Sequence, residues 1–100
     1  MVEVIQTNVF QAWLGSLRDR LAAARVQARI DRMAGGNPGD VKPVGDGVSE
    51  MRIDHGPGYR VYFIRRGAFL IVLLCGGDKS SQARDVAEAK RIAGQWKEQA

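Results

Sequence analysis

Arg52, Arg60 and Lys79 are the residues whose types and spacing best support chemistry in this sequence. Two arginines can hold a phosphate bidentately and stabilise the extra charge of a pentacoordinate transition state. Glu50, or a nearby lysine, can accept the proton of an attacking hydroxyl, and Tyr62 can stack against a base. This set suits RNA, whose own 2′-hydroxyl is the nucleophile, so that cleavage needs no metal.

The candidate site has a catalytic and an RNA-binding part. We expect Arg52, Arg60 and Lys79 to be catalytic, and Lys42, Glu50 and Tyr62 to bind RNA. The alternative is that Glu50, Arg52 and Asp54 simply belong to the solvated side of a strand and pair with Arg60 across it.

Other chemistries fit the residue inventory poorly. The sequence has one histidine and one cysteine, and neither stands in a metal-ligand spacing. His55 lies in a glycine-flanked turn, far from any serine placed for a catalytic triad. The stretch Gly76–Ser80 lacks the spacing of a nucleotide-binding loop. We therefore expect no metal, no nucleotide and no other small-molecule cofactor.

Composition indicates one ordinary globular domain spanning residues 1–100. Of these 100 residues, 45% are hydrophobic and 26% are charged, with a net charge of +4 that favours a polyanionic partner. A lone cysteine, Cys75, cannot form an internal disulfide. The start does not resemble a signal peptide, and the longest apolar run, Ala68–Cys75, is too short to span a bilayer. We expect a cytoplasmic protein with no membrane partner.

Three β-prone segments with short connections predict an antiparallel meander. They cover residues 48–54, 59–65 and 68–75. If Met51 lies opposite Val61 in the core, Arg52 lies opposite Arg60 on the other face. A two-residue turn at 66–67 then pairs Phe63 with Leu70. Residues 2–5 are β-prone and are predicted as a further edge strand.

Helices are expected on either side of this meander. The first begins after Thr7 and, with a break near Gly15, continues as an alanine- and arginine-rich helix to Met33. Residues 35–47 form a glycine- and proline-rich loop, and the final helix begins near Ser81. The prediction is an α+β domain, with an N-terminal helical hairpin and a C-terminal helix packed on one face of a small antiparallel sheet.

Arginines form a stripe on the second predicted helix, at positions 18, 25, 29 and 32. The simpler interpretation is that their stems cover the edge of the core. The alternative is a docking or RNA-facing surface.

The motifs GPGYRVYF and GGDKSSQ, with EMRI and GNPGD before them, resemble the HigB-like addiction-module killer proteins of the RelE/ParE toxin superfamily. The resemblance covers nearly the whole chain and implies a RelE/ParE-like fold. Its motifs place functional residues at Arg52, Arg60 and Lys79. The final long helix departs from RelE, which leaves the general acid and base without secure equivalents.

The resemblance implies a type II toxin of a bacterium or phage. Such a toxin pairs with an antitoxin, often of helix-turn-helix type, and RelE-like members cleave mRNA on the ribosome. By charge, an acidic or amphipathic antitoxin segment is expected over the basic cleft or the arginine stripe. Two alternatives stay open: a ParE-like toxin that inhibits gyrase without catalysis, and a basic interaction module without activity.

Overall fold

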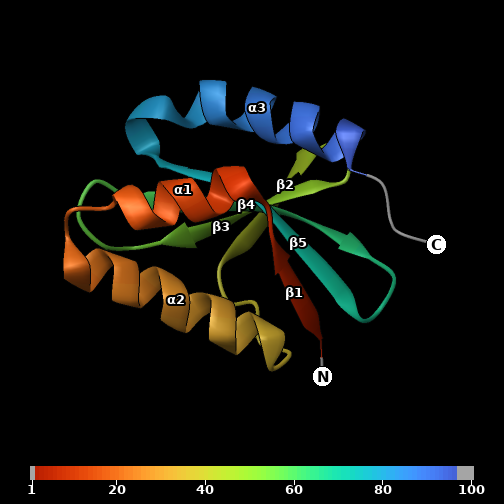
Figure 1. Ribbon diagram of the computed structural model, residues 1–100, viewed down its shortest axis with the longest axis horizontal. Helices are drawn as coiled ribbons and strands as arrows, with labels where there is room; N and C mark the ends of the chain where they lie inside the picture. Colours follow the sequence, from red (N-terminus) through yellow and green to blue (C-terminus); the bar gives the residue numbers. More distant parts are fainter. Residues whose placement is uncertain (1, 97–100) are drawn as a thin grey trace.

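The computed structural model describes residues 2–96, which form a five-stranded sheet with helices on both faces (Figure 1). The helices are α1 (Asn8–Ser16), α2 (Arg20–Ala34) and α3 (Gln82–Gln95), and a 3-10 turn, η1 (Lys79–Ser81), precedes α3. The strands are β1 (Glu3–Gln6), β2 (Val41–Gly45), β3 (Val48–Ile53), β4 (Tyr59–Arg66) and β5 (Leu70–Asp78), in the order β1-β5-β4-β3-β2. The predicted α+β class is confirmed.

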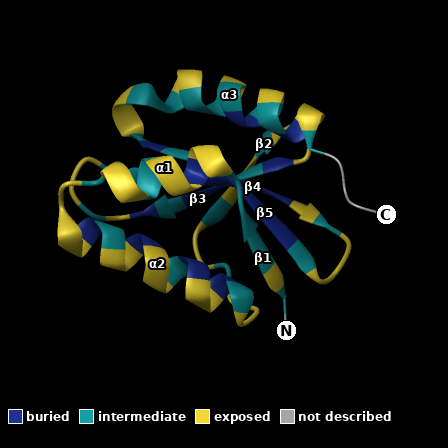
Figure 2. Ribbon diagram, in the orientation of Figure 1, coloured by how far each residue is buried: buried dark blue, intermediate teal, exposed yellow. Residues whose placement is uncertain are grey.

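The helices cover opposite faces of the sheet, so the expectation that they share one face is wrong. Phe10 of α1 and Val26 of α2 belong to one buried cluster, whereas Ala89 of α3 packs with Tyr62 and Leu74 in another. Figure 2 shows buried segments along the sides of α2 and α3 that face the strands. The reason lies in β5, which is apolar on both faces and must be covered on both.

The N-terminal segment forms two helices rather than one bent helix. Asp19 ends the connection and caps α2 by accepting hydrogen bonds from the backbone N–H groups of Leu21 and Ala22. The apolar face of α2 is buried at Ala22, Val26, Ile30 and Met33. Leu21, on another side of α2, is 57% exposed. No helix within residues 2–96 is both long and apolar enough to cross a membrane.

The register of β3 against β4 is the predicted one. Met51 lies opposite Val61, Arg52 opposite Arg60 and Glu50 opposite Tyr62. This register places Met51 and Ile53 of β3 on the same face as Val61 and Phe63 of β4, in one buried cluster. This register brings the two arginines side by side.

The predicted register of β4 against β5 is wrong. Phe63 pairs with Leu73 rather than Leu70, and β5 begins two residues later than expected. A bulge between Tyr62 and Phe63 also adds a residue to β5, since Tyr62 pairs with Cys75. An apolar run without alternation gave no sequence signal for either shift.

The two outer strands complete the sheet. The predicted edge strand exists as β1, and it pairs in parallel with β5, with Val4 opposite Ile71. The segment 35–47 is not entirely a loop, because β2 lies within it and pairs with β3. Lys42 therefore stands on a strand, opposite Glu50. Pro43 is tolerated there because β2 is an edge strand.

Candidate functional site

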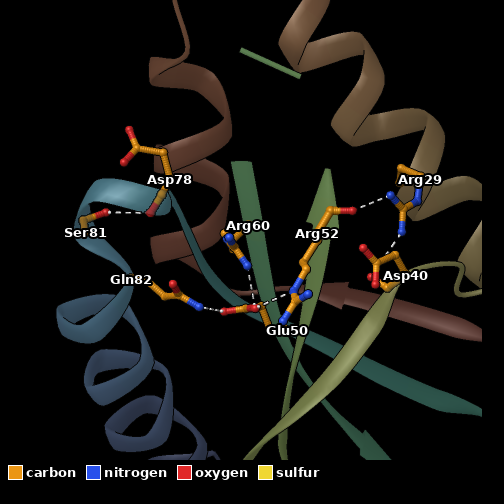
Figure 3. A network of polar contacts seen from close by, with 8 residues as sticks. All are labelled: Arg29, Asp40, Glu50, Arg52, Arg60, Asp78, Ser81 and Gln82. Carbon is orange, nitrogen blue, oxygen red and sulfur yellow. Dashed lines mark hydrogen bonds and ion pairs between the residues drawn. The ribbon is translucent and has the colours of Figure 1, made fainter. Parts of the chain in front are cut away.

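Glu50 is at the centre of a buried polar network between β3, β4 and the start of α3. Its Oε1 accepts hydrogen bonds from Arg60 Nη1 at 2.8 Å and from Arg52 Nε at 3.2 Å. Its Oε2 accepts one from Gln82 Nε2 at 2.8 Å. Figure 3 shows these three side chains converging on the carboxylate, which is fully buried.

The Glu50 carboxylate is kept in its charged form. Burial opposes the charge, but the hydrogen bonds from Gln82 and Arg52 and the charge of Arg60 outweigh it and lower the pKa of Glu50. Both oxygens are occupied by partners of the same chain. The expectation that Glu50 contacts RNA is therefore corrected: this carboxylate orients the arginines and is not positioned to take a proton from a substrate.

A cleft of about 330 Å³ opens beside this network, at the end of the β3–β4 hairpin. Its wall includes Arg52, Arg60 and Lys79, the three residues expected to be catalytic. The Arg52 side chain is 37% exposed and that of Arg60 is 12% exposed. The fold thus brings three cationic side chains to one cleft, although Arg52 and Lys79 are 27 positions apart in the sequence.

Tyr62 and Lys42 do not line the cleft. Tyr62 is fully buried under α3, and burial raises its pKa, helped by the negative charge of Glu50. It therefore cannot stack against a base, and the expectation that it binds RNA is wrong. The cause is α3, which covers the face that the meander alone would have left open. Lys42 is exposed on β2, outside the cleft.

The aromatic residue and the carboxylates of the cleft are Tyr59, Asp40 and Asp54. Tyr59 lies next to His55, with ring centroids 6.5 Å apart in a stacked arrangement. His55 Nε2 lies 3.1 Å from Asp19 Oδ2, so the hairpin turn is tied to the start of α2. Tyr59 thus gives the cleft an aromatic surface, and Asp40 and Asp54 give it proton acceptors. None of the three was assigned to the site from the sequence.

Arg29 of α2 supports the backbone at the cleft. Its guanidinium donates to the carbonyl oxygen of Arg52 at 2.5 Å and to that of Pro38 at 3.2 Å. Desolvation lowers its pKa, the charge of Arg32 lowers it further, and the charge of Asp40 opposes the decrease. The arginine stripe was the sequence signal for this residue. Gln82, by contrast, was predicted only as part of a helix start.

Comparison with known proteins gives a family. Residues 12–97 match the family described as phage derived protein Gp49-like (DUF891). An uncharacterized protein of Haemophilus influenzae is 47% identical over 92 residues, which are 92% of this chain and 93% of that protein.

The match overturns the assignment to the HigB-like branch, because the Gp49-like family is not a member of the RelE/ParE superfamily. The short motifs misled because much of their content serves turns and close packing, which unrelated folds also require. The chain belongs to the Gp49-like family of phage-derived proteins.

Proposed function

We propose that this protein is the toxin of a toxin–antitoxin pair and that it cleaves RNA in the cleft beside Glu50. Family membership supports the toxin–antitoxin context. The observation that carries the nuclease proposal is the cleft itself, in which Arg52, Arg60 and Lys79 converge. Within residues 2–96, the buried Nε of Arg60 has no hydrogen-bond acceptor, so this guanidinium keeps an unsatisfied donor at the wall of the cleft.

The reaction uses the substrate's own hydroxyl. The 2′-oxygen attacks the adjacent phosphorus, the bond from phosphorus to the 5′-oxygen breaks, and the products are a 2′,3′-cyclic phosphate and a 5′-hydroxyl. Arg52, Arg60 and Lys79 stabilise the negative charge that develops on the phosphoryl oxygens. Glu50 holds Arg60 and Arg52 in place, which lowers the entropic cost of binding the phosphate.

Proton transfer falls to the cleft's carboxylates and lysine. Asp40 interacts with the charge of Arg29. Asp54 lines the cleft and, within residues 2–96, has no hydrogen bond or ion pair from its side chain. We assign Asp54 as the acceptor of the 2′-hydroxyl proton and Lys79 as the donor to the departing 5′-oxygen.

The proposed partners follow from this role. An antitoxin neutralises the protein by covering its basic surface, and we propose that it is of helix-turn-helix type. The proposed substrate is mRNA, bound at the ribosomal A site.

Induced expression without the antitoxin tests the function. We expect growth arrest and RNA fragments that begin with a 5′-hydroxyl. Arg60→Ala and Lys79→Ala should each abolish cleavage and toxicity while circular dichroism reports a folded chain. Lys79 is exposed, so its variant stays informative if loss of Arg60 unfolds the protein. Arg91→Ala is the control, because this α3 arginine pairs with Glu88 outside the cleft.

The alternatives give different results in the same experiment. DNA damage signalling with intact RNA would indicate a gyrase inhibitor and overturn the nuclease. Unaffected growth would indicate an interaction module. If the Lys79→Ala and Arg60→Ala variants are both stably folded and both still cleave RNA, the assignment of the active site to this cleft is wrong.

A further inference from the structure

A second groove lies on α2, next to the cleft. It has a volume of about 290 Å³ and is lined by Arg25, Arg29 and Arg32 together with Ala28, Ile53 and Asp54. Ile53 and Asp54 also line the cleft, so that the two depressions share a wall. No residue of this groove other than Asp54 is used in the proposed reaction.

The groove presents positive charge that the protein does not neutralise. Arg25 and Arg32 are exposed, and within the described residues neither forms an ion pair or a side-chain hydrogen bond. Among the described residues, Asp54 is the single carboxylate on its wall, against three arginines. The Arg29 guanidinium donates hydrogen bonds to the carbonyl oxygens of Arg52 and Pro38, and its positive charge still lines the groove.

Spacing along the helix suits a repeating anion. Arg25 and Arg32 are seven residues apart, which places their backbones about 10 Å apart on one side of α2. Guanidinium groups bind phosphate oxygens bidentately. Several phosphates of one strand can therefore be met in succession along this helix.

The shared wall identifies the ligand. The cleft has the size of a small ligand pocket, so nucleotides beyond the scissile phosphate must lie on neighbouring surface. A strand that leaves the cleft past Asp54 enters the α2 groove directly. An acidic peptide would also match the charge of the groove. Only a nucleic acid strand, however, would carry a phosphate into the cleft and further phosphates into the adjoining groove.

We propose that the α2 groove is a second binding site, for the phosphodiester backbone of the RNA strand whose scissile phosphate occupies the cleft. This proposal rests on the proposed function for the direction of the strand. It assigns Arg25 and Arg32 as backbone contacts that extend binding without taking part in cleavage.

Binding of uncleavable RNA tests the groove separately from catalysis. The probes are labelled 2′-O-methyl oligonucleotides, one about 12 nucleotides long and one about three, because single-strand sites commonly cover about 4–16 nucleotides. Replacing the 2′-hydroxyl blocks the nucleophile but keeps the phosphates. Fluorescence anisotropy at several salt concentrations gives the affinity and its salt dependence.

The groove variant is Arg25→Ala with Arg32→Ala. We expect its affinity for the long probe to fall about tenfold at low salt. The negative slope of log affinity against log salt should become shallower by about 1.4, or 0.7 for each lost phosphate contact. The short probe, which fits within the cleft, should bind as it does to the native protein.

The matched control is Arg18→Ala with Arg20→Ala. It removes the same charge from exposed positions that do not line the groove. We expect its affinity for the long probe to change less than twofold. An equal loss in both double variants would mean unspecific attraction and would overturn the proposal.

Three further outcomes are decisive. Unchanged binding of the long probe to the groove variant would contradict the proposal. Weakened binding of a labelled polyglutamate peptide, with RNA binding intact, would identify a peptide-docking surface instead. Groove-dependent binding by a protein that cleaves no RNA would support this site while the nuclease assignment fails.

Discussion

Gly77 lies so close to Asp85 that a Cβ atom on the glycine would sit 1.8 Å from the carboxylate Oδ2. Its neighbour Gly76 meets the opposite helix, where a Cβ would lie 2.3 Å from Cε3 of Trp13. Because successive strand residues face opposite sides, the two glycines let α1 and α3 both approach β5. The pair of glycines is therefore a packing feature and not a phosphate cradle.

Gly77→Ala should destabilise the protein by about 1–3 kcal/mol, because overpacking forces α3 away from the sheet. The measurement is the free energy of unfolding from urea titration. Gly94→Ala is the matched control: this helical glycine has open space around its Cβ position, so the change should stabilise α3 by about 1 kcal/mol. An equal effect of both substitutions would contradict this packing.

Glu50→Gln should lower the free energy of unfolding by about 3 kcal/mol near neutral pH, because two guanidinium groups lose their buried counter-charge. The native pKa of Glu50 is below its usual 4.5. Its stabilisation is thus present above about pH 4.5 and disappears as the pH falls through the native pKa. The variant should therefore approach the native protein in acid.

Urea titrations from neutral to acidic pH measure this convergence. Glu3→Gln removes an exposed carboxylate of β1 and should run parallel to the native protein. A Glu50→Gln curve that also runs parallel would show that the carboxylate does not carry the acid sensitivity.

Arg29→Ala should slow RNA cleavage more than it weakens RNA binding. Arg29 holds the backbone of Arg52 and does not itself line the cleft, so its loss displaces the Arg52 guanidinium without removing it. Single-turnover cleavage should fall about tenfold, and Arg29→Lys should restore part of it. Thermal melting separates this effect from unfolding. A fall in the cleavage rate that is fully explained by a lower melting temperature would indicate a purely structural role.

Cys75 should resist alkylation in the folded protein. It is 4% exposed, and burial raises the pKa of its thiol to about 12, so the reactive thiolate is scarce. Iodoacetamide labelling followed by mass spectrometry should show modification only in denaturant. Rapid labelling of the native protein would mean that α3 opens away from β5.

The arginines of the cleft were predictable because Met51, Ile53, Val61 and Phe63 fix one register for β3 and β4. The sequence could not place α3, since β5 has no alternation to say which face remains open. For the same reason the burial of Tyr62 was missed. The bond between Gln82 and Glu50 joins residues 32 positions apart and depends on that placement. The family could not be inferred from motifs that turns and close packing explain.

The parallel pairing of β1 with β5 has a consequence for synthesis. Thr7 follows β1 directly, and its hydroxyl donates to the carbonyl oxygen of Leu74, 67 residues later. Until β5 has left the ribosome, the first strand has no neighbour and the apolar side of α1 has no surface to cover. A nascent chain consequently acquires its complete sheet only after residues 70–78 have emerged, and products terminated before β5 cannot close it.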